Sequence, residues 1–266
     1  MSADTQGRID HEVHGHVLVI TINRPAKRNG FTPAMFDQLA KAYSLLEDDA
    51  QLRVGVLCAA GEHFTAGLDL PTFAGLMQRG EQAIADGEVD PVDLGTPGLR
   101  RRSKPLVVAV KGITYTLGIE LMLAADIVVA ADNCRFSQLE VKRGIMATGG
   151  ATLRMAERAG AGNALLHLLT GDEFDAAEAL RLHFVQKVVA AGTEMALAMQ
   201  IAHTIAEQAP LAVVATRQSV LKAIELGPVA ARAEFDEIQK KLANSADAAE
   251  GVRSFSDKRA AVFKGC

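Results

Sequence analysis

The stretch 111–127 reads KGITYTLGIELMLAADI, and the stretch 61–70 reads GEHFTAGLDL. Each follows a short apolar segment that predicts a buried strand, at 106–110 and 54–59 respectively, and each runs into residues typical of a helix. Glycines in these loops let the backbone turn sharply and approach a ligand. Backbone N–H groups at a helix start lack acceptors within the helix and bind negative charge. Two such donors directed at one point would form an oxyanion hole, although glycines that only make tight turns fit the same sequence.

Two glutamates near these loops are candidates for proton transfer. Glu120 lies within the apolar run 119–125, and Glu140 follows Leu139. A carboxylate in an apolar setting is costly unless it is paired or functional, and burial raises its pKa toward the range useful for acid–base catalysis. The alternatives are a helix-surface charge for Glu120 and an exposed loop position for Glu140. The apolar neighbours of Glu120 argue against the first alternative, whereas the sequence around Glu140 does not decide the second.

Outward from these loops, the chain predicts a mixed α/β core. Residues 8–14 and 16–22 are predicted strands of a hairpin around Gly15, and the apolar residues of the second strand indicate that it is buried. Thr32 and Pro33 suit a helix N-cap and first helical position, and apolar residues follow at helical spacing. Further strands are predicted at 126–131, 135–137 and 185–189, with a helix from 117 or 118 to 125.

The remaining segments are irregular or helical. The stretch 71–104 lacks sustained periodicity and predicts short helices within mobile loops. Asp175 and Glu178 have the spacing of a capping box before a helix. We therefore divide the chain into a catalytic α/β core, residues 1–195, and a helical oligomerisation region, residues 196–266. The late helices are predicted at about 193–208, 211–226, 228–244 and 247–257.

Composition excludes several classes of protein. The 266 residues carry a net charge of −4, which gives no overall basic surface for nucleic acid, and 49% of them are hydrophobic, as in ordinary globular domains. The apolar runs are too short to span a membrane, and the first residues lack the apolar region of a signal peptide. Three widely spaced cysteines indicate neither a disulfide framework nor a metal site and fit a cytoplasmic location. Neither a GxSxG motif nor a Walker phosphate loop is present.

Two clusters of polar residues are interpreted as surface features. Arg100–Arg102 and Lys104 form a short basic run, interpreted as a solvated loop, with a local phosphate-binding patch as the alternative. His11, His14 and His16 flank the expected hairpin turn. They are interpreted as exposed side chains, because a metal site would need further ligands and an inward geometry.

Five segments carry motifs in chain order: INRPAKRNG (22–30), HFTAGLDL (63–70), KGITYTLGIELMLAADI (111–127), FSQLEVKRGI (136–145) and GVRSFSDKRAAVFKG (251–265). In these segments the chain resembles the enoyl-CoA hydratase/isomerase family, also called the crotonase family, along nearly its whole length. The resemblance implies an α/β fold, namely a crotonase-like spiral of ββα units with a C-terminal helical trimerisation region. It also implies assembly as a homotrimer or hexamer.

The resemblance further implies a mechanism. The backbone N–H groups of Leu68 and Leu117 would hold the thioester oxygen and stabilise an enolate as it forms. Glu120 and Glu140 match the two catalytic glutamates of the hydratases and would hold one water. Glu120 takes a proton from this water as its oxygen attacks the β-carbon, and Glu140 gives a proton to the α-carbon. We expect no metal and no redox cofactor, because general acid–base catalysis on an enolate held by backbone dipoles needs neither, and coenzyme A is part of the substrate.

Other motif positions imply contacts with the acyl-CoA thioester substrate. Lys258 and Phe263 match tail residues that meet the nucleotide across a subunit boundary. The positions expected near the nucleotide on the same chain are Ala26, Lys27 and Arg28. The remaining expected substrate contacts, toward the pantetheine and thioester, are Ala66, Gly67, Asp69, Leu70 and Gly118.

Two departures from the family pattern put substrate choice in doubt more than fold. Thr116 and Leu117 stand where two glycines are usual, and ATGGA at 147–151 replaces a proline-containing glycine run. The expected function is hydration of an enoyl-CoA. The alternatives are a double-bond isomerase or other enolate chemistry on the same scaffold, and a non-catalytic acyl-CoA-binding protein.

Overall fold

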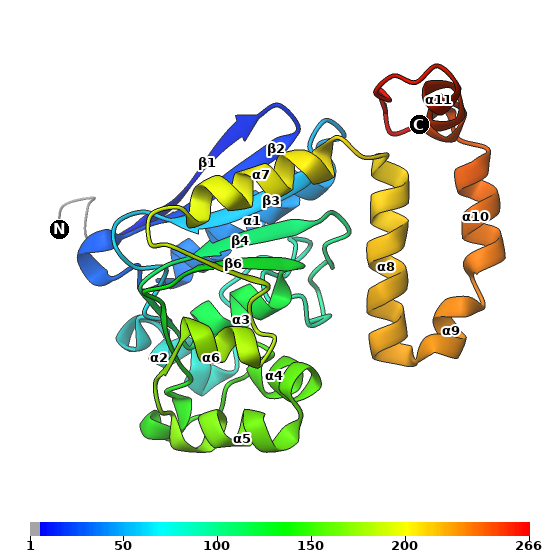
Figure 1. The fold of residues 1–266 in the computed structure, drawn as a ribbon. Coiled ribbons are helices and arrows are strands. Elements are labelled where there is room, and N and C mark those ends of the chain that lie inside the picture. The colour runs from blue at the N-terminus through cyan, green and yellow to red at the C-terminus, as the bar shows by residue number, and fades with distance from the viewer. Residues whose placement is uncertain (1–5) are drawn as a thin grey trace.

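The structure, a computed structural model, describes residues 6–266 and is built on a six-stranded sheet (Figure 1). Its strand order is β1-β2-β3-β4-β6-β9, and only the β1–β2 pair is antiparallel. The two predicted strands at 54–59 and 106–110 are confirmed at both ends. The strands are β1 (Arg8–His14), β2 (Val17–Asn23), β3 (Val54–Ala59), β4 (Leu106–Val110), β6 (Ile127–Ala131) and β9 (Lys187–Val189).

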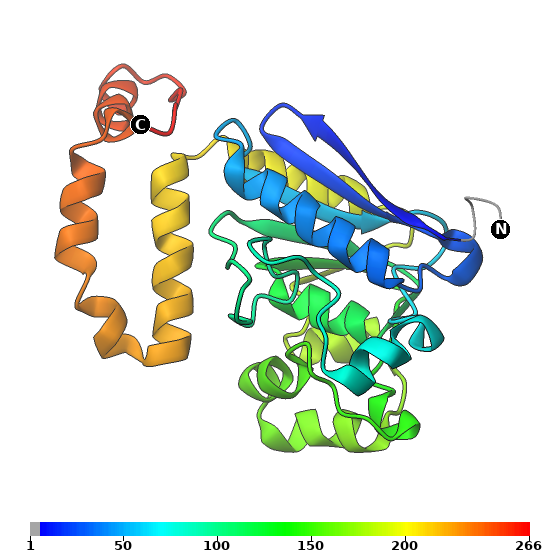
Figure 2. The ribbon, with the colours of Figure 1, turned by 180° about the vertical axis from the view of Figure 1, so that it is seen from behind.

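Both faces of this sheet are covered by helices, as a largely parallel sheet requires. Along β2, Leu18 and Ile20 belong to the core on the side of α1 (Pro33–Asp48). Val17 and Val19, whose side chains point to the other face of the sheet, pack with α7 (Glu194–Ala206). Figures 1 and 2 show these helices on opposite faces. The predicted start of α1 is confirmed, because the Thr32 side chain accepts a hydrogen bond from the Met35 amide.

A smaller sheet and a buried helix complete the core. The small sheet contains β5 (Ile113–Tyr115), β7 (Arg135–Ser137) and β8 (Phe174–Asp175), of which only β7 was predicted. All eight residues of α3 (Leu117–Ala124) are buried, so the helix that carries Glu120 has no solvent-facing side. The remaining elements before α7 are η2 (Pro25–Lys27), α2 (Leu70–Arg79), η3 (Glu140–Arg143), α4 (Ala151–Ala159), α5 (Ala161–Thr170) and α6 (Ala176–Arg181).

The helices after α7 form what we call the C-terminal arm, comprising α8 to α11, which stands to one side of the sheet (Figure 1). The predicted single helix at 228–244 is wrong, because the chain breaks around Glu234. This residue forms an ion pair with Lys222 of α8, and the break folds α10 back beside α8. The arm consists of α8 (Pro210–Leu226), α9 (Pro228–Arg232), α10 (Phe235–Ala243) and α11 (Ala246–Ser256).

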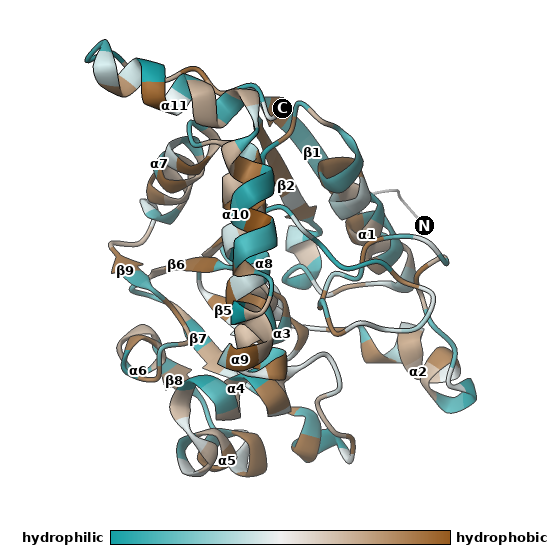
Figure 3. Ribbon diagram, turned by 90° about the vertical axis from the view of Figure 1, so that its right-hand side faces the viewer, coloured by the Kyte–Doolittle hydropathy of each residue, from teal (hydrophilic) through white to brown (hydrophobic). Residues whose placement is uncertain are grey.

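Two further segments differ from expectation. The predicted region of short helices at 71–104 contains one helix, α2, followed by a described stretch without helix from 80 to 104. The division drawn at residue 195 falls near the start of α7, which packs against the sheet. The part of the chain that stands apart therefore begins at α8. Figure 3 shows that polar and apolar residues alternate along α10. Within residues 6–266 no helix has both the length and the apolar character needed to cross a membrane.

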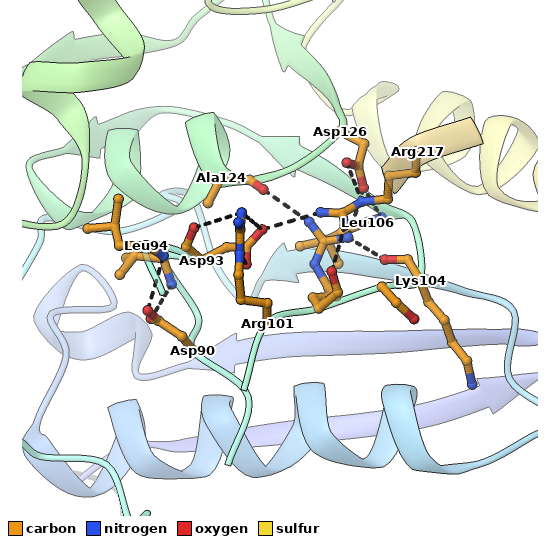
Figure 4. Close-up of polar contacts among 12 residues, drawn as sticks. Asp90, Asp93, Leu94, Arg101, Lys104, Leu106, Ala124, Asp126 and Arg217 are labelled. Carbon is orange, nitrogen blue, oxygen red and sulfur yellow. Dashed lines mark hydrogen bonds and ion pairs between the residues drawn. The ribbon is translucent and has the colours of Figure 1, made fainter. Parts of the chain in front are cut away.

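The basic run at 100–104 is a solvated loop only in part, because Arg101 is exposed whereas Arg102 is buried. Arg102 is buried, and its guanidinium lies 2.8 Å from Asp126 Oδ2 and donates to the carbonyl of Ala124 at 3.0 Å. Lys104 Nζ donates to carbonyls at the end of α1. Local sequence does not indicate this burial, because Asp126 lies 24 residues further along the chain. Figure 4 shows the surrounding group of charges.

We expect Arg102→Ala to lower the free energy of unfolding by about 3–5 kcal/mol, because removing one partner of a buried ion pair leaves the other uncompensated. The matched control is Arg100→Ala. Arg100 pairs with Asp48 on the surface, and such a pair contributes about 0–1 kcal/mol. Chemical denaturation of both variants measures the difference. Equal losses of stability would show that Arg102 is no more important than a surface residue.

Candidate active site

The first glycine loop presents the amide of Leu68 to solvent. Phe31 donates its N–H to the Gly67 carbonyl at 2.8 Å, and Asp69 donates its N–H to the Phe31 carbonyl at 2.8 Å. Because residues on either side of Leu68 bond toward Phe31, the Leu68 N–H is directed to the opposite side of the chain. It donates to no acceptor within residues 6–266.

The second loop presents the amide of Leu117. This residue begins α3, so its N–H lacks an acceptor within the helix, and none is supplied by the rest of the described chain. Thr116 before it has φ 49° and ψ −113°, a conformation that glycine adopts readily and that costs other residues about 1–3 kcal/mol. A Cβ at Gly67 would lie 1.7 Å from Thr116 Oγ1. The two loops therefore touch, and only glycine fits at position 67.

A buried asparagine holds the first loop in place, which the sequence reading did not anticipate. Asn29 is fully buried, and its amide nitrogen donates to the carbonyls of Ala60 and His63, each at 2.8 Å. The Asn29 carbonyl accepts from Thr65 Oγ1 at 2.7 Å, and the same hydroxyl oxygen accepts from the Gly67 amide at 3.0 Å. These bonds connect the end of β3 to the loop and fix the backbone on which Leu68 lies.

Glu120 points from the buried helix α3 toward the start of α4. Its Oε1 accepts hydrogen bonds from the amides of Gly149 at 2.6 Å and Ala151 at 3.4 Å. Ala151 is the first residue of α4, and the amides at a helix N-terminus stabilise a negative charge. A Cβ at Gly149 would lie 2.4 Å from Glu120 Oε2, so glycine at this position allows the carboxylate to approach.

Glu140 lies in the 3₁₀ turn η3 and is half-buried. Its neighbour Gln138 is almost completely buried, and with its amide nitrogen facing the carboxylate it donates to Glu140 Oε2 at 3.1 Å. This amide orients the second carboxylate. Gln138 lies within the motif FSQLEVKRGI, but the sequence alone indicated no role for it.

Burial gives the two glutamates unusual proton affinities. Loss of solvation and, second, the charge of Glu140 raise the pKa of Glu120 from 4.5 to about 7, against the opposing effects of the Ala151 and Gly149 amides and Arg154. Burial also raises the pKa of Glu140. Glu120 can therefore take up or release a proton near neutral pH, and Glu140 holds a proton to a higher pH than an exposed glutamate does.

The two loops and both glutamates line one cavity of about 440 Å³. Of the residues predicted from the sequence, it contains Leu68, Leu117, Glu120 and Glu140, together with Lys27, Ala66, Asp69 and Leu70. The residues around this cavity that the sequence reading missed include Arg24, Met77, Thr116, Arg143, Ile145, Met146 and Thr148.

The other predicted substrate contacts lie outside this cavity. Ala26 and Arg28 are exposed on the neighbouring turn, whereas Gly67 and Gly118 are buried in the loops. Lys258 is exposed. Phe263 lines hollows beside the arm, including the one between α8 and the core. Asp69 reaches the cavity but forms an ion pair with Arg24 at 2.8 Å, so its carboxylate is already partnered.

Comparison with known proteins agrees with this architecture. A family model described as enoyl-CoA hydratase/isomerase matches residues 12–266. Enoyl-CoA hydratase EchA19 of Mycobacterium tuberculosis is 34% identical over 95% of each chain. Carnitinyl-CoA dehydratase of Citrobacter koseri is 33% identical over 95% of this chain and 96% of its own.

Solved structures give the same result. The crystal structure of a probable enoyl-CoA hydratase/isomerase from Mycobacterium abscessus is 44% identical, with a TM-score of 0.93 over 97% of this chain and 98% of its own. These matches span the two sheets and the C-terminal arm. The chain belongs to the enoyl-CoA hydratase/isomerase family, also called the crotonase family.

Proposed function

We propose that the protein is an enoyl-CoA hydratase, which adds water reversibly across the 2,3 double bond of an enoyl-CoA thioester. One observation carries the proposal: two main-chain amides that have no acceptor among residues 6–266 and two carboxyl groups whose pKa is raised by burial line the same cavity. Relatives described as enoyl-CoA hydratase and carnitinyl-CoA dehydratase support water addition or removal on a CoA thioester.

In this proposal the Leu68 and Leu117 amides bind the thioester oxygen. As water attacks the β-carbon, the electrons of the double bond move toward the carbonyl and form an enolate. Each amide stabilises the developing negative charge, and one such donor typically contributes about 3–4 kcal/mol to the lowering of the barrier. The start of α3 adds its partial positive charge behind Leu117.

The carboxyl pair supplies and removes protons. Ionised Glu120 takes a proton from water as the oxygen–carbon bond forms, and protonated Glu140 delivers its proton to the α-carbon. Hydration thus ends with Glu120 protonated and Glu140 ionised. In this state the pair is ready for the reverse reaction, dehydration. A proton must pass from Glu120 to Glu140, through the bound water, before each hydration.

The coenzyme A contacts are part of the same proposal. Lys27 lines the cavity and is exposed, so it can meet a phosphate without breaking an ion pair. Ala26 and Arg28 lie on either side of Lys27 in the chain and are also exposed. Lys258 and Phe263 follow α11, the last helix of the arm. We propose that they contact the coenzyme A bound to a neighbouring subunit in a homotrimer or hexamer.

The first test measures turnover as loss of the ultraviolet absorbance of trans-2-enoyl-CoA substrates of increasing chain length. We expect Glu120→Gln and Glu140→Gln each to lower kcat by about 10²–10⁴-fold, because each removes one proton-transfer group. Calorimetric binding of the CoA thioester should persist in both variants. Glu157→Gln, on an exposed position of α4, is the matched control. No turnover along the series, or full turnover in both glutamine variants, would overturn the proposal.

The second test is the pH dependence of kcat/KM. At low pH both carboxyl groups are protonated and no base remains, whereas above about pH 7 the pair loses its last proton and no acid remains. We therefore expect a bell-shaped profile whose alkaline side begins near the pKa of Glu120. Activity that keeps rising through about pH 9 would contradict a shared-proton mechanism.

The third test is stability. The pKa of Glu120 is about 7 in the folded protein and near 4.5 when exposed, so folding becomes less favourable as pH rises between these values. Glu120→Gln lacks this effect. We expect it to be more stable than the parent protein above pH 7, by up to about 3 kcal/mol, and to lose the advantage below about pH 4.5. Thermal unfolding at several pH values measures this, and an advantage independent of pH would contradict the raised pKa.

A further inference from the structure

The C-terminal arm is attached to the core by a buried arginine. Among the seventeen residues of α8, all of which the structure describes, Arg217 alone is buried. Its guanidinium lies 2.7 Å from Asp126 Oδ1 and 3.4 Å from Asp93 Oδ2, and it donates to the Arg102 carbonyl at 2.6 Å (Figure 4). An apolar hollow of about 650 Å³ separates other parts of α8 from the core. Polar contacts therefore contribute much of the attachment of α8.

Asp93 is where this attachment continues toward the active site. It is buried and has φ 49°, a left-handed conformation that is uncommon outside glycine and asparagine. Its carboxylate also pairs with Arg101, at 2.9 Å. Its backbone carbonyl faces a different element and accepts a hydrogen bond from Arg154 Nη2 of α4 at 3.0 Å. One residue thus contacts the arm through its side chain and α4 through its backbone.

The segment at Asp93 also supports the turn that holds Glu120. A Cβ at Gly150 would lie 2.5 Å from Arg154 Nη1 and 3.2 Å from Leu94 Cδ2, so the guanidinium and the leucine side chain both pack closely against this glycine. The residues on either side of Gly150 are the two amide donors to Glu120 Oε1. Arg154 Nη1 is buried and has no hydrogen-bond partner among the described residues, so within residues 6–266 the Asp93 carbonyl is the one hydrogen-bond acceptor of this guanidinium.

We propose that Arg217, Asp93 and Arg154 are positioning residues for Glu120, so that docking of the C-terminal arm sets the orientation of this catalytic carboxylate against its two amide donors. The inference rests on the proposed hydratase function. It adds to it a connection from the oligomerisation region of the chain to the acid–base pair. The physical path contains three contacts: arginine on α8 to Asp93, Asp93 to arginine on α4, and the start of α4 to Glu120.

The direction of the effect follows from the groups that face Glu120. Glu140 raises its proton affinity, whereas Arg154 and the amides of Gly149 and Ala151 lower it. If the arm loosens, the segment at Asp93 no longer holds Arg154, and the amides move away from Oε1. Glu120 then holds its proton to a higher pH. The alkaline side of the activity profile should move in the same direction.

The test compares Arg217→Met, Arg154→Met and the double variant with the parent protein. We expect each single variant to lower kcat by about tenfold or more with little change in KM, since catalytic groups displaced by about 1 Å lose up to about 10²-fold. Both should shift the alkaline side of kcat/KM to higher pH. The double variant should match Arg154→Met alone, because both changes interrupt one path.

Two further variants separate positioning from general loss of structure. Arg217→Lys should recover part of kcat and of the pH profile, because its ammonium group can still reach Asp93 and Asp126. Lys222→Met on the same helix removes an ion pair within the arm, and we expect the parent profile from it. If Arg217→Met does not fold, the lysine variant alone carries the comparison.

The result that overturns the proposal is an alkaline limb in Arg217→Met and Arg217→Lys that coincides with the parent limb, or additive losses in the double variant. A readout independent of turnover separates this outcome from failure of the proposed function. Infrared spectroscopy can follow the titration of the Glu120 carboxyl, whose band is assigned by its loss in Glu120→Gln. We expect the band to persist to higher pH in Arg217→Met and Arg154→Met, even if no enoyl-CoA is turned over.

Discussion

A carboxyl group placed in an apolar layer determines how the elements around it must be arranged. Glu120 lies on a helix that is buried on every side, where an ionised side chain is costly unless hydrogen-bond donors surround it. The start of α4 supplies those donors through Gly149 and Ala151. The smaller sheet, α4 and the loops before them have to be arranged so that these amides reach one oxygen. The fold thus keeps a carboxyl group in an environment where burial raises its pKa to about 7.

The two loops that carry Leu68 and Leu117 show a second constraint, which acts on the backbone. Both leave parallel strands and present an amide that has no acceptor among residues 6–266, while buried contacts from Asn29 and Thr65 fix the first loop. Thr116 carries a conformation better suited to glycine. Strain and unpartnered donors are unfavourable for folding, and they gather here because the cavity requires them. Thr116 is also one of the positions at which this chain departs from the family motif described above.

The sequence predicted what local patterns determine. The bounds of β3 and β4 and the Thr32 cap follow from short apolar runs and from residue types at adjacent positions, and all were confirmed. The family resemblance predicted the fold and indicated which glutamates to examine. Contacts between distant segments were not predictable in this way. The burial of Arg102 and the break at Glu234 depend on partners far along the chain, which no local pattern reveals.

The polar attachment of α8 has a consequence for the order in which the chain opens. The sheet and α1 are held by a continuous apolar core, whereas α8 buries a single side chain, and that side chain is charged. Segments with few buried apolar contacts open at a lower free energy than the global unfolding of the protein. We therefore expect the arm to detach from the sheet at a lower free energy than the sheet itself unfolds. Its backbone amides then exchange with solvent hydrogen while those of the central strands remain protected.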